Sequence, residues 1–121
     1  MGRIQFVIHK DKKILLEDFT NITVGSDFDK TIREAQAVIA SQPPKSVLAC
    51  FDATNCSFNT EMLNKMKKFT KANTPYIKKT TVIGINGLLQ VALSAVSKFS
   101  GREFNTFNTR EEAMDFLASI E

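Results

Sequence analysis

The sequence predicts an α/β fold in which helices alternate with the strands of a mostly parallel or mixed sheet. Apolar segments of strand length alternate with segments whose apolar residues recur at helical spacing, in the order β-β-α-β-α-β-α-β-α. The first two strands are separated by only a short polar turn, so the chain opens with a β-hairpin. With 121 residues, 43% hydrophobic composition and no linker or repeat, we expect residues 1–121 to form a single domain.

The first half of the chain supplies the hairpin, one helix and a buried strand. Residues 3–8 and 14–19 form the hairpin strands around the polar residues 9–13. Ser26 and Asp29 then have the spacing of a capping box, ahead of a helix whose apolar face consists of Phe28, Ile32, Ala35 and Ile39. Pro43 and Pro44 end this helix, because proline removes backbone donors and disfavours helical geometry before it. Residues 46–52 follow as a strand.

The second half repeats this alternation. Asn59 is the predicted N-cap of a helix with Met62, Leu63, Met66 and Phe69 within one arc. Residues 76–85 are rich in β-branched side chains and read as a strand that ends near Gly84. A third helix begins near Asn86 or Gly87. Residues 102–107 form a short strand, and Thr109 with Glu112 makes a capping box for a last helix with Ala113, Phe116, Leu117 and Ile120 on its apolar face.

The third helix is unusually apolar. Its apolar side chains cover more than half of the circumference, and the narrow polar stripe contains only one charge, Lys98. We therefore expect a homodimer in which this helix takes part, because packing on one side of a sheet would leave Leu or Val side chains in water. The alternative is a monomer in which the hairpin or the last helix covers the same surface.

Parallel strands bring their carboxyl ends to one edge of a sheet, where such folds bind ligands. The loops 52–59, 84–87 and 107–109 should meet there, and a helix N-terminus at this edge favours an anion. These loops hold the candidate partner- or ligand-binding residues, which are Asp52, Thr54, Asn55, Ser57, Asn59, Thr60, Asn86 and Gly87. The same residue types also turn chains and cap helices, which alone accounts for them. Gly84 and Gly87 fit close strand-to-helix packing better than a phosphate-binding turn.

Three stretches, residues 42–63, 71–93 and 99–117, together resemble the STAS-like domains, the family of anti-sigma-factor antagonists of sporulation. Members typically carry an Asp-Ser-Ser-Gly motif whose serine is phosphorylated. This chain has Thr60, Glu61 and Met62 at the matching place, so the motif is missing. Ser57 and Thr60 are the neighbouring hydroxyls, and phosphorylation, if it occurs, is expected at one of them. The resemblance implies a non-enzymatic regulatory or protein-interaction module.

Charge is distributed unevenly along the chain. Residues 62–102 carry eight basic and no acidic side chains, although the net charge is only +3. Most of these lysines fit a solvated outer helix face, namely Lys65, Lys67, Lys68 and Lys71. An acidic protein or an anionic lipid is the alternative partner, and nucleic acid is the least favoured, since stacking aromatics are sparse.

Catalytic and metal chemistry are not indicated. His9 is the only histidine, and Cys50 and Cys56 have no metal or redox spacing, so we expect no cofactor, no metal and no enzymatic activity. Free thiols, with no signal peptide or membrane span visible, favour a cytoplasmic protein. The leading hypothesis is a module that binds a protein partner or a small ligand at the carboxyl edge of the sheet. A carrier or sensor of an apolar, lipid-like molecule is the alternative, which the third helix and its flanking lysines suggest.

Overall fold

The computed structural model describes residues 2–23 and 26–120 and confirms the predicted order of elements. Five strands form one mixed sheet in the order β1-β2-β3-β4-β5. The first pair is the antiparallel hairpin, and every later pair of neighbours is parallel. The strands are β1 (Ile4–His9), β2 (Lys12–Asp18), β3 (Val47–Asp52), β4 (Ile77–Ile83) and β5 (Asn105–Phe107).

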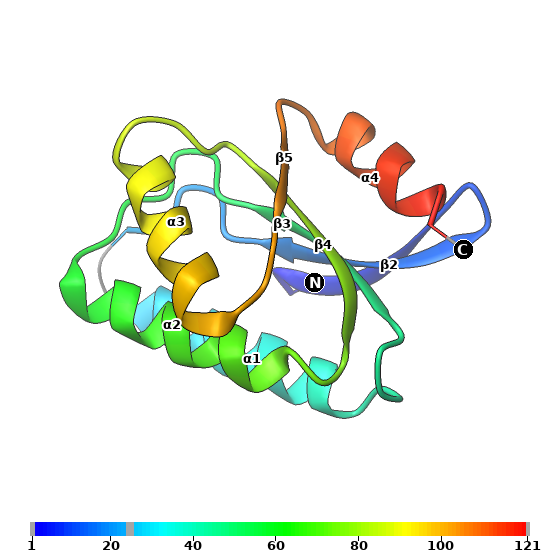
Figure 1. The fold of residues 1–121 in the computed structure, drawn as a ribbon, viewed down its shortest axis with the longest axis horizontal. Helices are drawn as coiled ribbons and strands as arrows, with labels where there is room; N and C mark the ends of the chain where they lie inside the picture. The colour runs from blue at the N-terminus through cyan, green and yellow to red at the C-terminus, as the bar shows by residue number, and fades with distance from the viewer. Residues whose placement is uncertain (1, 24–25, 121) are drawn as a thin grey trace.

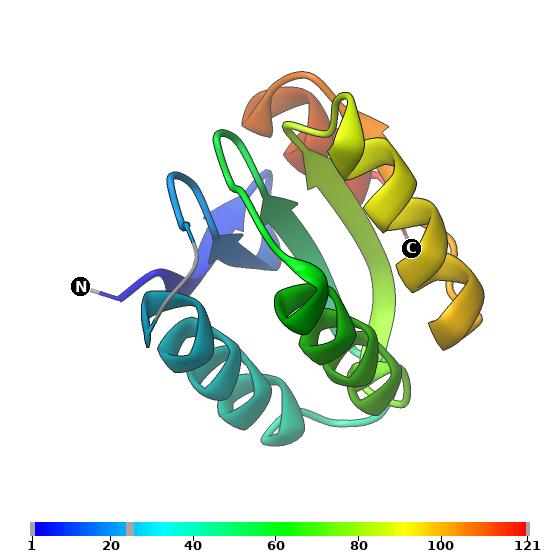
Figure 2. The same cartoon turned by 90° about the vertical axis from the view of Figure 1, so that its left-hand side faces the viewer.

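Helices cover both faces of this sheet. The parallel strands follow one another across the sheet in sequence order, so crossovers of one hand place their helices on the same face. These helices are α1 (Ser26–Ala40), α2 (Thr60–Asn73) and α3 (Leu88–Ser100). The helix α4 (Arg110–Ala118) follows the last strand and lies on the opposite face (Figures 1 and 2). Among the described residues, no helix is both long and apolar enough to span a membrane.

Alternation along the strands divides the core between the two faces. In β2, Leu15 packs with α1 and α2, whereas Ile14 and Leu16 pack with α4. Phe19, just after β2, is fully buried and stacks on Phe51 with ring centroids 4.4 Å apart. Burying one such aromatic side chain stabilises the fold by about 1.5–3 kcal/mol.

Local capping explains where two of the helices begin. The predicted N-cap Asn59 accepts a hydrogen bond from the backbone N–H of Met62 at 2.9 Å. Thr109 likewise caps α4 through the backbone N–H of Glu112 at 3.1 Å. The Ser26 side chain lies outside the described part of the structure, so the predicted capping box with Asp29 stays a prediction. Helix α3 begins after Gly87 without any side-chain cap.

The predicted strand at residues 102–107 was too long, because β5 contains only Asn105–Phe107. Gly101 ends α3 in a left-handed conformation with φ of 72°. The Ser97 hydroxyl then donates a hydrogen bond to the Arg102 carbonyl oxygen, and the Arg102 side chain reaches across to Thr70 and Thr80. These bonds hold the chain in an irregular return from α3 until it joins β4 at Asn105.

Helix α3 lies apart from the strands. Its main packing partner is α2, and its contacts with the sheet are few. Leu88 and Val91 on its outer side are 81% and 68% exposed, and Phe99 is 47% exposed. The expectation that one-sided packing leaves apolar side chains in water is confirmed for this chain, and α4, on the other face of the sheet, does not cover them. The homodimer itself stays a prediction.

Candidate functional site

The carboxyl edge of the sheet is held together by two matching aspartate turns. At the end of β3, one carboxylate oxygen of Asp52 accepts hydrogen bonds from the Thr54 backbone N–H at 3.0 Å and from its hydroxyl at 2.6 Å. At the end of the neighbouring strand β2, Asp18 accepts the same two bonds from Thr20, at 3.0 and 2.6 Å. Both are aspartate turns of the kind that reverses a chain without a glycine.

Arg110, in the first turn of α4, joins these two turns. Its Nε donates to the second oxygen of Asp52 at 2.6 Å, and its Nη2 lies 3.5 Å from Asp18. Partial burial alone would raise the pKa of Asp18, but the Thr20 hydrogen bonds and the charges of Arg110 and Arg3 lower it overall. Every carboxylate oxygen of Asp52 is thus engaged within the chain, which indicates a structural role for this predicted site residue.

The other predicted residues lie exposed around this edge. Two loops, 52–59 and 84–87, lie directly against each other, because a Cβ placed on Gly84 would be 2.6 Å from the Thr54 backbone nitrogen. Asn55 has a φ of 58°, and Gly87 has a φ of 48°. The exposed members of the set are Thr54, Asn55, Ser57, Asn59, Thr60, Asn86 and Gly87. The structure therefore brings the predicted residues to one edge, but as a surface rather than as a pocket.

A pocket lies below α3, on the side of the sheet that α1 and α2 cover. Its volume is about 110 Å³, and its lining is almost entirely apolar. Helix α3 contributes Leu89, Ala92, Leu93 and Val96; α2 contributes Met62, Leu63, Met66 and Phe69; the strands contribute Phe51, Ile77 and Val82. Cys56, Phe58 and Ile85 from the edge loops complete one end. The pocket thus extends to the carboxyl edge of the sheet.

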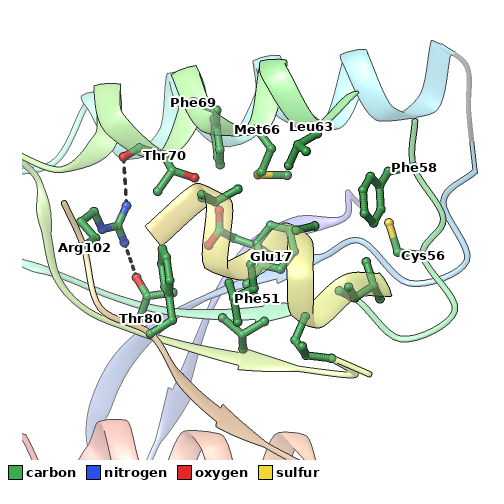
Figure 3. A pocket seen from close by; sticks show the side chains of 18 of the residues that line it. Glu17, Phe51, Cys56, Phe58, Leu63, Met66, Phe69, Thr70, Thr80 and Arg102 are labelled. Carbon is green, nitrogen blue, oxygen red and sulfur yellow. Dashed lines mark hydrogen bonds between the residues drawn. The ribbon is translucent and has the colours of Figure 1, made fainter. Parts of the chain in front are cut away.

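Glu17 lies near the middle of this apolar lining (Figure 3). The residue is only 4% exposed, and its Oε1 atom has no hydrogen-bond partner in the described structure. Leaving a buried polar atom unpaired costs about 1–3 kcal/mol. Burial raises the pKa of Glu17 to about 7, although the charge of Arg102 acts to lower it. A carboxyl group that titrates near neutrality therefore points into the pocket.

Arg102 lies at one end of the pocket, opposite Cys56 and Phe58 (Figure 3). Its guanidinium donates to the Thr70 carbonyl oxygen at 3.1 Å and to the Thr80 hydroxyl, and it lies 5.2 Å from the ring centroid of Phe104. Burial lowers the pKa of Arg102, while the Glu17 charge raises it. A guanidinium carries five N–H groups, so three remain without an acceptor among the described residues.

The lysines of α2 are mainly on the outer surface. Lys65 lies 2.8 Å from Asp29 on α1 and 3.7 Å from Glu61, so it is compensated in the fold although not in the sequence around it. Lys71 lies over the Phe99 ring at 5.2 Å from its centroid. Lys65 thus lies on the outer helix face and is paired with acidic residues of the same chain. Its position can be explained without an anionic partner.

His9 and the cysteines have separate places in the fold. The His9 Nε2 atom lies 2.6 Å from Asp115 of α4, which also pairs with Lys10. Cys50 is buried in the core, as expected, and Cys56 is half-buried; both are free thiols. In residues 2–23 and 26–120, no group of three histidine, cysteine or acidic side chains is placed to hold a metal ion.

No protein-family model matches the chain, and no curated protein matches its sequence. Among solved structures, it is similar to the crystal structure of an uncharacterized protein from the DUF3478 family, with a SpoIIAA-like fold, from Shewanella loihica PV-4. The TM-score is 0.72 at 19% sequence identity, over 94% of this chain and 91% of the other. The chain has a SpoIIAA-like fold. The resemblance to STAS-like, anti-sigma-antagonist-like domains is thereby confirmed at the level of the fold.

Within this SpoIIAA-like fold, the two charged residues of the pocket, Glu17 and Arg102, were not among the predicted site residues. Glu17 follows the apolar run Ile14, Leu15 and Leu16, and strand alternation places it on the same face as Leu15. A charged residue at a core-facing strand position was the signal that could have identified it. The sequence around Arg102 contains no comparable signal, because the position of this side chain depends on the path of the irregular segment between α3 and β5.

Proposed function

We propose that this chain is a non-enzymatic regulatory module that binds a small apolar molecule in the pocket below α3 and contacts a protein partner at the neighbouring surface. The observation that carries the proposal is an apolar cavity that contains an unpaired, buried carboxyl group, Glu17. Such a combination of apolar walls with few polar groups is typical of ligand sites. The SpoIIAA-like fold supports a regulatory role in general terms.

The size of the pocket limits what it can bind. A cavity of about 150 Å³ accommodates the six non-hydrogen atoms of benzene, so about 110 Å³ holds roughly four before any adjustment. A whole lipid would need several hundred Å³. In the lipid-carrier alternative, the ligand is therefore restricted to a molecule with a short alkyl or aryl group. Any molecule larger than the cavity requires α3 to move outward.

Helix α3 connects the pocket with the outer surface. Leu89 and Leu93 face the ligand space, while Leu88 and Val91 on the other side are exposed. The pocket lies between this helix and the sheet, so a molecule bound there contacts α3 directly. In this proposal, ligand binding shifts α3 and changes the apolar surface and edge loops that the partner contacts.

The proposed partner is a protein, and the contact residues proposed are Thr54, Asn55, Ser57, Asn59, Thr60, Asn86 and Gly87. Asp52 positions this edge through Arg110 and Thr54. Two free thiols fit a reducing compartment, and we propose a cytoplasmic location on that basis.

Filling the pocket tests the ligand-binding part. Ala92→Leu places a larger side chain in the cavity, and Ala95→Leu makes the same change on α3 at a residue that does not line it. Indole, 1-hexanol and hexanoate serve as probes in thermal unfolding and in ¹H–¹⁵N NMR titrations. At least one should stabilise the parent chain and the Ala95→Leu variant, with shifts at pocket residues, and not the Ala92→Leu variant. No binding by any probe, or equal binding by both variants, would contradict the proposal.

A further inference from the structure

The chemical class of the ligand can be inferred from the polar groups in the pocket, and this inference rests on the proposed function. Two charged side chains line the cavity, Glu17 from β2 and Arg102 from the return after α3. The half-buried thiol of Cys56 lies at the far end (Figure 3). Lining residues from α1, α2, α3, β3 and β4 are apolar or uncharged.

These two groups offer complementary hydrogen-bonding atoms. Glu17 has the unpaired Oε1 atom, and Arg102 has N–H groups beyond those bound to Thr70 and Thr80. Because burial raises the pKa of Glu17 to about 7, a large fraction of this carboxyl is protonated at neutral pH and can donate an O–H. The pocket then presents one hydrogen-bond donor from each residue and a single positive charge.

Charge balance distinguishes three kinds of ligand head group. An amine would add a second positive charge beside Arg102 in an apolar cavity, which is costly. A hydroxyl could donate to ionised Glu17 and accept from Arg102, but it has one oxygen and no charge, so its hydrogen bond with Arg102 is weaker than that of a carboxylate. A carboxylate accepts from both residues, neutralises Arg102 and keeps Glu17 protonated.

We propose that the pocket binds a small monocarboxylate, with its carboxylate between Glu17 and Arg102 and its alkyl or aryl group against α2 and α3. In this arrangement the negative charge of the bound carboxylate favours the protonated form of Glu17. Binding therefore takes up a proton wherever free Glu17 is ionised, and affinity falls as pH rises above 7. A neutral alcohol bound through ionised Glu17 has the opposite dependence.

A matched series of probes tests this inference with the full chain. Hexanoate, 1-hexanol and hexylamine share the alkyl group and differ in the head group. Isothermal titration calorimetry at pH 6, 7 and 8, in two buffers of different ionisation enthalpy, gives affinity and proton uptake. Hexanoate should bind at least tenfold more tightly than the other two at pH 7, and should lose about fivefold in affinity between pH 7 and pH 8.

Two variants assign the effect to the named residues. Glu17→Gln should keep hexanoate binding through its amide N–H and lose the proton uptake, because glutamine does not titrate. Arg102→Gln should weaken hexanoate at least tenfold and leave 1-hexanol within about threefold; Arg102→Lys keeps the charge and should recover part of the loss. Binding of 1-hexanol equal to hexanoate, or hexanoate affinity that rises with pH, would overturn the monocarboxylate while leaving the proposed function standing. Absence of binding by any of the three, and by indole, would overturn both.

Discussion

Replacing Glu17 with glutamine removes the ionisable group beneath α3, and its effect on stability should depend on pH. Burial raises the pKa of Glu17 from its ordinary value of 4.5 to about 7 in the folded chain. The folded state thus holds a proton that the unfolded state releases between these two values. This contribution to stability is fully present below pH 4.5 and is lost as pH rises through 7.

The magnitude follows from proton linkage. One bound proton changes the free energy of unfolding by about 1.4 kcal/mol per pH unit, so the window from 4.5 to about 7 corresponds to about 3 kcal/mol. Glu17 is only 4% exposed, so solvent screening does not reduce this effect appreciably. The Glu17→Gln variant does not titrate at this position, and relative to the parent chain it should gain about 3 kcal/mol across the window.

Urea unfolding at half-unit steps from pH 4.5 to 8, at constant ionic strength, measures this difference. With a slope of about 1.5 kcal/mol/M, the unfolding midpoint of the parent chain should fall by about 2 M relative to the variant. Contributions from the other titrating groups are common to both chains and cancel in the difference. Glu103→Gln, at an exposed position, controls for the removal of one carboxylate. A difference between parent and Glu17→Gln that stays constant over pH 5–8 would refute the reasoning.

Four further predictions concern the edge loops and α3. Gly84→Ala should lower the stability measured by thermal unfolding by about 3 kcal/mol or more, because φ is +81° and a Cβ would lie 2.6 Å from the Thr54 backbone nitrogen. The control Gly101→Ala, also at positive φ but with open space around the Cβ, should lower it by only about 1–2 kcal/mol. Equal losses in the two variants would argue against the close approach of Gly84 to Thr54. Asp52→Asn keeps an acceptor for Thr54 but loses the ion pair with Arg110, so its free energy of unfolding in urea should fall by about 1–2 kcal/mol. Asp52→Ala loses both interactions, and its free energy of unfolding should fall by about 3 kcal/mol. A larger loss for Asp52→Asn than for Asp52→Ala would be inconsistent with the aspartate turn. Light scattering at micromolar concentration should give twice the 13.5 kDa chain mass and a monomer for Leu88→Asp; the chain mass for the parent would rule out the homodimer. Incubation with a cognate kinase and mass spectrometry should place any hydroxyl phosphorylation at Ser57 or Thr60, where the N-terminus of α2 favours a phosphate; label found only elsewhere would exclude this site.

The order of elements could be predicted because its signals are local. Asn59 and Thr109 cap their helices through bonds within three residues, and hydrophobic spacing along the same segments identifies the buried faces. The orientation of α3 could not be predicted in this way, because an apolar arc of more than half a turn is compatible with several orientations. Within that arc, Leu89 and Leu93 line the pocket, whereas Leu88 and Val91 are exposed.

The candidate site depends on contacts between distant segments. Glu17 and Arg102 are far apart in sequence, and their common pocket exists only because α2 and α3 cover the sheet at a distance from it. Strand alternation predicts the face on which Glu17 lies, but not how fully it is buried. The polar residues between Asp52 and Asn59 are easily identified as candidate site residues in a sequence, because several side chains that can form hydrogen bonds follow one another. A single acidic residue next to an apolar run, such as Glu17, is instead easily interpreted as the end of a strand.

The position of α4 has a consequence for how the chain folds. The sheet face formed by Ile14, Leu16, Leu48, Cys50 and Ile83 is covered by Ala113 and Leu117 of this helix. The contacts that fasten α4 to the hairpin, His9 with Asp115 and Lys12 with the Ile120 carbonyl, join residues 106 and 108 positions apart. Contacts of such sequence separation slow folding, because the entropy of closing a long loop is lost before the contacts form. The α/β units on the other face can assemble from near neighbours, so the rate at which this chain reaches its native state should be governed by the return of α4 to the hairpin.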